Sequence, residues 1–172
     1  MAKIKICGLF RPEDIDIVNE ALPDFAGFVF APSRRRVTPE WAREQCARLD
    51  RRIKTVGVFV DDFEHYDFLD YVQVYEGSSC RVFGNGEAFP VFDGPQPGSG
   101  EAFDWSTIPV CGGPWFLAGG INLSNIREAV ATGAWCVDVS SGAETDDVKD
   151  LKSVQALVEA VRKGGENWKT KT

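Results

Sequence analysis

The N-terminal stretch that decides the fold covers residues 3–30 and reads KIKICGLFRPEDIDIVNEALPDFAGFVF. Its charged and apolar alternation at 4–7 predicts a strand, and the proline and acidic residues at 11–14 predict the first turn of a helix. A second apolar run at 25–30 predicts another strand. A strand, a helix and a strand in this order are typical of the units that build a parallel sheet.

The same order of apolar runs and helical spacings continues along the chain. The strands that this rhythm predicts lie at 55–60, 71–75, 115–118 and 136–139, and the helices lie at 38–49, 62–69, 103–108, 123–131 and 148–162. We therefore predict an α/β fold in which strand and helix units repeat around a parallel sheet.

The rhythm breaks between residues 76 and 92. Apolar runs at 80–83 and 89–92 follow the preceding runs after only short links, which contain Glu76-Gly-Ser-Ser79 and Gly84-Asn-Gly-Glu87. A parallel crossover needs about a dozen residues, whereas an Asn-Gly pair suits an antiparallel hairpin. We expect a local meander in which the 80–83 strand is reversed. Two crossover helices would then be absent, and aromatic side chains or another subunit would have to cover the sheet there.

Length and charge limit the possible functions. The 172 residues suffice for one buried core and are too few for two ordinary domains, so we expect one domain over 1–165 and a frayed tail over 166–172. Nineteen Lys and Arg against 26 Asp and Glu give a net charge of -7, which repels polyanions and argues against a nucleic-acid partner. The cluster Arg34-Arg-Arg36 can still attract a small anion.

Cysteine usage indicates a reducing compartment. The five cysteines are Cys7, Cys46, Cys80, Cys111 and Cys136. They are odd in number, form no CxxC pair and are accompanied by a single histidine, so neither a disulfide framework nor a metal site is expected. No apolar run approaches the roughly 18 to 20 residues that cross a bilayer. We therefore expect a cytoplasmic protein without a membrane contact.

Two candidate acid–base residues follow strands of the predicted sheet, where functional side chains of parallel folds collect. Cys7 ends the first strand, and it could either pack as a small apolar residue or act as a thiolate base or nucleophile. Asp93 follows the 89–92 run, and it could either form a turn before Gly94 or donate a proton once burial raises its pKa.

Glycine-bearing turns follow the last two predicted strands. They contain Gly119 and Gly120 in one case, and Ser140, Ser141 and Gly142 in the other. Glycine lets backbone N–H groups approach an anion, so this pair of turns indicates a phosphate site. Asp138 lies within the preceding strand, where it can orient its neighbours.

Six motifs occur in a characteristic order and spacing. They are KIKICG at 3–8, GFVFAPSRRR at 27–36, VGVFV at 56–60, GSG at 98–100 with FDW at 103–105, LAGGIN at 117–122 and VDVSSG at 137–142. Together they closely resemble phosphoribosylanthranilate isomerase over residues 3 to about 161. The resemblance implies a (β/α)8 TIM barrel, here shortened by the meander around strands 4 to 6, that catalyses an Amadori rearrangement in tryptophan biosynthesis without a cofactor or metal.

The resemblance also implies roles for individual residues. Asp93 would protonate the ribose ring oxygen as general acid, and Cys7 would remove the C2′ proton as general base. Arg36 would pair with the anthranilate carboxylate. The remaining residues expected to bind the phosphorylated sugar substrate are Gly119, Gly120, Asp138, Ser140, Ser141 and Gly142. A thiolate base and a carboxylic acid need opposite environments, which we expect to find close together.

The chain departs from the family pattern in two places. Relatives usually carry Gln-Leu-His-Gly after the fourth strand, where this chain has Gln73-Val-Tyr-Glu-Gly77, and a stretch between Gly77 and Asp93 is missing. The expected catalytic and phosphate-binding ends remain, so we expect activity.

Two other functions are compatible with parts of the sequence. A catalytically silent sugar-phosphate-binding barrel could act as a scaffold, but it would need neither Cys7 nor Asp93. An indole-glycerol-phosphate synthase would need Lys and Glu groups that we do not place at strand ends. The sequence leaves a monomer and a homodimer equally open.

Overall fold

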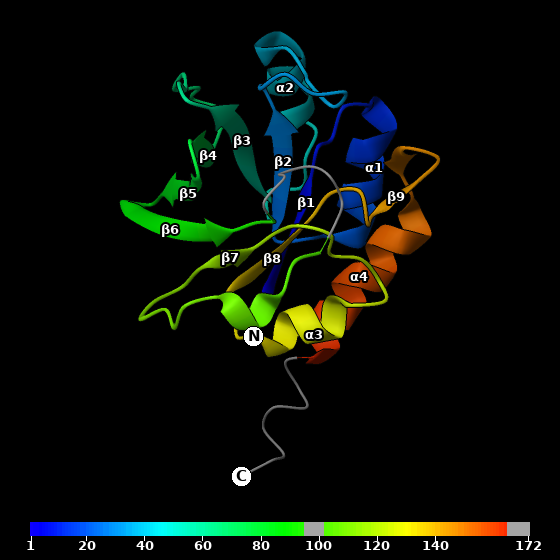
Figure 1. Cartoon of the computed structure of the whole chain (residues 1–172). Helices are drawn as coiled ribbons and strands as arrows, with labels where there is room; N and C mark the ends of the chain where they lie inside the picture. The colour runs from blue at the N-terminus through cyan, green and yellow to red at the C-terminus, as the bar shows by residue number, and fades with distance from the viewer. Residues whose placement is uncertain (95–101, 165–172) are drawn as a thin grey trace.

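The structure is a computed structural model that describes residues 1–94 and 102–164 (Figure 1). The motif at 98–100 and the expected tail at 166–172 lie outside the described residues. Eight strands close into a barrel in the order in which they occur along the chain. The predicted α/β barrel is therefore confirmed.

The barrel strands are β1 (Lys3–Cys7), β2 (Phe25–Val29), β3 (Lys54–Val60), β4 (Tyr71–Glu76), β5 (Ser79–Gly84), β6 (Glu87–Phe92), β7 (Phe116–Leu117) and β8 (Cys136–Val139). The helices are α1 (Pro12–Ala21), α2 (Pro39–Cys46), α3 (Ile126–Ala131) and α4 (Leu151–Gly164), with a 3₁₀ turn η1 (Trp105–Thr107). A short hairpin, β9 (Glu144–Thr145) and β10 (Val148–Lys149), precedes α4.

Strand alternation separates two apolar clusters. In β1, Ile4 and Ile6 point outward and pack with residues of α1 and α4 such as Val18 and Leu157. The second cluster fills the barrel interior with inward-facing residues of several strands, among them Phe25, Tyr71, Val82, Phe89 and Phe116. Each fully buried side chain of this size contributes roughly 1.5–3 kcal/mol to folding. The interior cluster closes one end of the barrel, so a ligand cavity is possible only at the other end.

Local sequence signals place the first two helices. Before α1, the Asp14 carboxylate accepts hydrogen bonds from the backbone N–H groups of Phe10 and Arg11, at 3.0 and 3.1 Å. Before α2, the Thr38 hydroxyl accepts from the Trp41 N–H at 3.3 Å. These bonds satisfy N–H groups at or beside each helix start that have no partner within the helix.

The segment from β4 to β6 pairs differently from the rest of the barrel. Strand β5 is antiparallel to both β4 and β6, whereas the other neighbouring pairs are parallel. Asn85 and Gly86 both have positive φ, 53° and 78°, which the tight turn between β5 and β6 requires. In Figure 1 the helices gather beside β1, β2, β7 and β8. On the outer side of β5, Phe83 is 39% exposed.

Several predicted helix positions need correction. Residues 62–69 form no regular helix, so that prediction is wrong. The link between β3 and the parallel β4 must run back along the strands, and eight helical residues would span only about 12 Å. The link is instead fixed by aromatic packing, with Tyr66 stacked 5.3 Å from Phe68 and tilted 5.4 Å from Phe30.

The other differences are shifts of boundaries. The expected 103–108 helix is reduced to the single turn η1, which Asp104 caps by accepting from the Ser106 N–H. Helix α3 begins three residues later than predicted, and the β9–β10 hairpin occupies the start of the last predicted helix. Among the described residues, no helix has the length and apolar character needed to span a membrane.

Candidate active site

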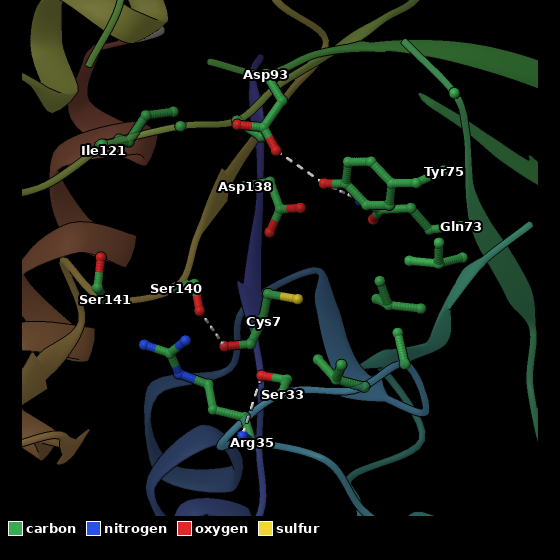
Figure 2. Close-up of a pocket in the computed structure, with 18 residues that line it drawn as sticks. Cys7, Ser33, Arg35, Gln73, Tyr75, Asp93, Ile121, Asp138, Ser140 and Ser141 are labelled. Carbon is green, nitrogen blue, oxygen red and sulfur yellow. Dashed lines mark hydrogen bonds between the residues drawn. The ribbon is translucent and has the colours of Figure 1, made fainter. Parts of the chain in front are cut away.

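A cavity of about 360 Å³ lies at the carboxyl ends of the barrel strands. Figure 2 shows its side chains converging from β1, β4, β8 and the loops after β2, β6 and β7. Seven of the predicted site residues line it: Cys7, Asp93, Gly119, Gly120, Asp138, Ser140 and Ser141. The barrel thus gathers into one cavity residues that are far apart in the sequence.

Two predicted site residues lie elsewhere. Arg36 is exposed and lines a separate surface hollow, because the bridge that it forms with Val29 turns its side chain away from the barrel mouth. Its neighbour Arg35 is buried and lines the cavity instead. Gly142 bridges to Asn122, in contact so close that an added Cβ would lie 2.8 Å from the Asn122 Cα. It therefore joins the two glycine-bearing loops without lining the cavity.

Lys5 supports the floor of the cavity beside Cys7, two residues away on the same face of β1. The Lys5 ammonium is fully buried and donates to Gln73 Oε1 and Asp138 Oδ2, each at 2.7 Å. Burial alone would lower the pKa of Lys5, but the Asp138 carboxylate and the Cys7 sulfur outweigh it and raise that pKa. Lys5 is therefore a permanent positive charge inside the barrel.

The Cys7 thiol has a raised pKa. Burial is the main cause, and the nearby Lys5 charge opposes it by favouring the thiolate. The Ser140 hydroxyl donates to the Cys7 carbonyl oxygen at 3.2 Å and ties β1 to the loop after β8. Cys7 is thus mostly a thiol at neutral pH, with a cation at hand to stabilise the thiolate when it forms.

Two donors among the described residues hold Asp93. Its Oδ2 accepts from the Tyr75 hydroxyl at 2.8 Å, and its Oδ1 accepts from the Gly94 N–H at 2.7 Å. Burial raises the pKa of Asp93, and the Tyr75 hydrogen bond partly offsets this. We expected opposite environments for acid and base, but burial raises the pKa of both groups. That expectation is wrong, although a raised pKa suits the acid.

The glycine-bearing loop after β7 lies against the acid. Gly119 has a φ of +87°, and an added Cβ would lie 2.7 Å from Asp93 Oδ1. The Gly120 carbonyl oxygen accepts from the side-chain amides of Asn122 and Asn125, at 3.2 and 3.0 Å. The loop is therefore rigid, and it needs glycine both for its backbone conformation and for its approach to Asp93.

A charged cluster fixes Arg35 at the cavity wall. Its Nε and Nη2 donate to the two carboxylate oxygens of Glu144 at 2.7 and 2.8 Å. Lys149, almost fully buried, donates to the same carboxylate at 2.6 Å and to the Ser140 carbonyl oxygen at 3.0 Å. Burial would raise the pKa of Glu144, but Arg35 and Lys149 hold it at about 2. Glu144 is therefore ionised and keeps the guanidinium in place.

Asp138 offers a free acceptor to a ligand. The residue is only 7% exposed, and its Oδ2 is taken by Lys5. Its Oδ1 is buried and has no hydrogen-bond partner among the residues that the structure describes. A buried acceptor without a partner is costly, so a bound hydroxyl or amine would gain from donating to it.

Sequence reasoning missed four residues of this site: Lys5, Arg35, Gln73 and Tyr75. Period-two alternation could have identified Lys5, because it places Lys5 on the same face of the strand as Cys7. Likewise, Gln73 and Tyr75 share the inward face of β4. Among the described residues, no three His, Cys, Asp or Glu side chains gather closely enough to hold a metal ion.

Comparisons with known proteins agree with the motifs. The family model of N-(5'-phosphoribosyl)anthranilate (PRA) isomerase matches residues 73–160. An N-(5'-phosphoribosyl)anthranilate isomerase of Streptococcus pneumoniae is 38% identical over 194 aligned residues, covering 95% of this chain and 98% of the relative. The chain belongs to this isomerase family. The resemblance drawn from six sequence motifs is thereby confirmed, and with it the assignment to an isomerase of tryptophan biosynthesis.

Solved phosphoribosylanthranilate isomerases share the fold. The enzyme of Thermus thermophilus is 27% identical, with a TM-score of 0.77 over 94% of this chain and 98% of that chain. Another, solved in complex with reduced 1-(o-carboxyphenylamino)-1-deoxyribulose 5-phosphate, is 25% identical, with a TM-score of 0.73 over 95% of this chain and all of that chain. Because both alignments span nearly the whole chain, the barrel with β5 antiparallel is a variant of the family's TIM barrel.

Proposed function

We propose that Asp93 and Cys7 are the acid and base of an Amadori rearrangement. In this reaction N-(5-phosphoribosyl)anthranilate becomes 1-(2-carboxyphenylamino)-1-deoxyribulose 5-phosphate. The observation that carries the proposal is that a half-buried carboxyl and a buried thiol line the same cavity at the carboxyl ends of the strands. Family membership supplies the reaction, and the shared cavity supports giving these two roles to Asp93 and Cys7.

The proposed reaction needs one proton donor and one proton acceptor. Asp93, with its raised pKa, protonates the ribose ring oxygen while the anilino nitrogen supplies electrons, and the ring C1′–O bond breaks to leave an iminium ion. The Cys7 thiolate then removes the C2′ proton and gives an enolamine, which tautomerises to the ketose. The fixed Lys5 charge stabilises the minor thiolate form of Cys7 that carries out this step.

The two ends of the substrate would be held on opposite sides of these groups. The phosphate fits the glycine-bearing loops, where Gly119, Gly120 and Ser141 line the cavity. We assign the anthranilate carboxylate to Arg35 in place of Arg36, because Arg35 lines the cavity. Asp138 Oδ1 would accept from a sugar hydroxyl. Anchoring both ends would place the labile C2′ proton near Cys7.

A silent sugar-phosphate-binding scaffold is the less favoured alternative. Such a protein would gain nothing from burying a carboxyl group whose pKa is raised, or from a lysine beside a thiol. Both features lower the stability of the protein, and they are useful only in a reaction that transfers protons.

Loss of phosphoribosylanthranilate fluorescence, with the substrate generated in situ, tests the proposal. Cys7→Ala and Asp93→Asn should each lower kcat by about 10²–10⁴-fold. Titration calorimetry with a reduced product analogue should find their affinities within a few-fold of the parent. Cys46→Ala, a cysteine on α2 outside the cavity, is the matched control and should retain full activity. Near-normal turnover in either site variant would remove that residue from the mechanism.

The chain's five cysteines are free thiols, and Cys7 must stay reduced to act as a base. We therefore place the protein in the reducing cytoplasm, where it would work as a monomer or a homodimer on a small phosphorylated sugar. Activity that survives oxidation of Cys7 by peroxide would remove the reason for this placement.

A further inference from the structure

A chain of hydrogen bonds joins the interior lysine to the acid. Lys5 Nζ donates to Gln73 Oε1 at 2.7 Å, Gln73 Nε2 donates to the Tyr75 hydroxyl at 3.1 Å, and that hydroxyl donates to Asp93 Oδ2 at 2.8 Å. Asp138 anchors the first member of the chain through the opposite side of the Lys5 ammonium. Figure 2 shows Gln73 and Tyr75 side by side on β4, with the Tyr75 hydroxyl directed at Asp93.

The direction of this chain follows from its first member. An ammonium group can only donate, so Lys5 requires the Gln73 side-chain oxygen to face it. The Gln73 amide nitrogen must then face Tyr75, where it donates to the phenolic oxygen. With that oxygen already accepting, the Tyr75 proton is free to point to Asp93. Every bond therefore donates toward the carboxyl group, an arrangement in which successive bonds strengthen one another.

Within the part of the chain that the structure describes, few other polar or ionisable groups compete for Asp93 and Tyr75. Facing them are Lys5 from β1, Cys80 from β5 and Asp138 from β8. Cys80 accepts a long contact from Gln73 Nε2 at 3.6 Å, and burial raises the pKa of its thiol to about 12. Cys80 is therefore neutral, and Asp93 is the strongest acceptor within reach of the Tyr75 hydroxyl.

We propose that Tyr75, oriented by Gln73 and Lys5, is a positioning residue for Asp93. It holds the carboxyl group at the cavity wall and stabilises the carboxylate that remains after Asp93 has given its proton to the substrate. The phenolic proton stays on Tyr75 throughout, so no additional proton is transferred. The inference rests on the proposed role of Asp93. It also gives a function to the residue at which this chain departs from the family's Gln-Leu-His-Gly motif.

Removal of the phenolic hydroxyl is the decisive change. In Tyr75→Phe the carboxylate of Asp93 loses the hydrogen bond from the phenol, and a hydrogen bond to a charged group corresponds to about one to two pH units. The pKa of Asp93 should therefore rise by that amount, and the acid-side break of log(kcat/KM) against pH should move upward with it. Gln73→Leu keeps the phenol but removes the hydrogen bond that orients it. This variant should raise the pKa of Asp93 and the acid-side break by a smaller amount.

Tyr71→Phe is the matched control. Tyr71 lies four residues earlier on the same inward face of β4 and is buried, whereas Tyr75 is half-buried, and the Tyr71 hydroxyl accepts from Asn85. Its removal should leave the acid-side break in place. Thermal unfolding of all three variants checks that each is folded.

A second measurement is independent of turnover. Carboxyl ¹³C shifts of labelled aspartate, with the Asp93 signal identified by its loss in Asp93→Asn, report the pKa of Asp93 directly. A parent protein that binds the product analogue but shows no turnover would refute the proposed function, while this titration would still test Tyr75. An Asp93 pKa that is the same in Tyr75→Phe as in the parent, or an equal rise in Tyr71→Phe, would overturn the inference.

Discussion

Gly119→Ala is the sharpest single test of how the site is built. Gly119 has a φ of +87°, where alanine is strained by roughly 1–2 kcal/mol. The new Cβ would also lie 2.7 Å from Asp93 Oδ1 and 2.8 Å from the Gly94 nitrogen. To reach the ordinary contact distance of 3.4 Å, the first gap must open by about 0.7 Å. The substitution therefore displaces either the acid or the N–H group that holds it.

The expected effects on rate and stability are separable. A displacement approaching 1 Å at a reacting group can cost about 10²-fold, so kcat should fall by about 10- to 100-fold. Backbone strain alone should lower Tm by about 2–8 °C for a protein of this size. Gly133→Ala is the matched control, because Gly133 has a φ of +86° and no described atom within 4 Å of an added Cβ. It should lose similar stability and keep its activity.

The fluorescence assay for substrate loss, run beside thermal unfolding, distinguishes these effects. The reasoning is refuted if Gly119→Ala keeps a parental kcat, since the acid would then tolerate the contact. It is equally refuted if Gly133→Ala loses as much activity as Gly119→Ala, since the loss would then come from backbone strain and not from contact with Asp93.

The remaining predictions concern charge. Glu144→Gln leaves Arg35 and the buried Lys149 without their carboxylate and should cost about 3 kcal/mol in urea unfolding. Glu159→Gln, which breaks an exposed ion pair on the surface of α4, should leave the urea midpoint close to that of the parent. The pKa of Glu144 is about 2 in the folded protein and 4.5 ordinarily. The stability that ionised Glu144 supplies should therefore be complete above about pH 4.5 and lost toward pH 2. A loss of unfolding free energy in Glu144→Gln that stays constant through this pH range would contradict the ion pair. The rate should fall below the raised pKa of Asp93, where thiolate becomes scarce, and above the raised pKa of Cys7, where protonated acid becomes scarce. A single-sided profile would show that only one of the two groups takes part.

Much of the barrel follows from local sequence signals. Alternation in KIKIC and the proline-led start of α1 predict the first strand and helix almost to the residue. The 62–69 helix could not be excluded in this way, because its failure depends on the distance that the link must span between two parallel strands. That distance is a property of the assembled barrel.

The residues of the site also fall into two groups, those that local sequence signals predict and those that only tertiary contacts determine. Cys7 and Asp93 are predictable because each follows an apolar strand, and strand ends meet at one mouth. The sequence does not predict which of Arg35 and Arg36 lines the cavity, because three consecutive arginines carry the same local signal. That choice is decided by the pairing of Val29 with Arg36 and by Glu144, which lies 109 residues from Arg35. Tertiary partners of this kind leave no trace in short motifs.

The barrel closes where β1 pairs with β8, and this seam affects how the enzyme folds. The Lys5–Asp138 ion pair joins residues 133 apart, whereas the Gln73–Cys80 contact in the β4–β5 hairpin spans only seven. Loop-closure entropy makes the distant contact about 2–3 kcal/mol more costly to form, so the hairpin can assemble early and the seam late. Cys7 and Asp138 stand on the two strands of that seam. Recovery of activity during refolding should therefore lag behind recovery of β-structure, because no partly folded intermediate possesses a working catalytic centre.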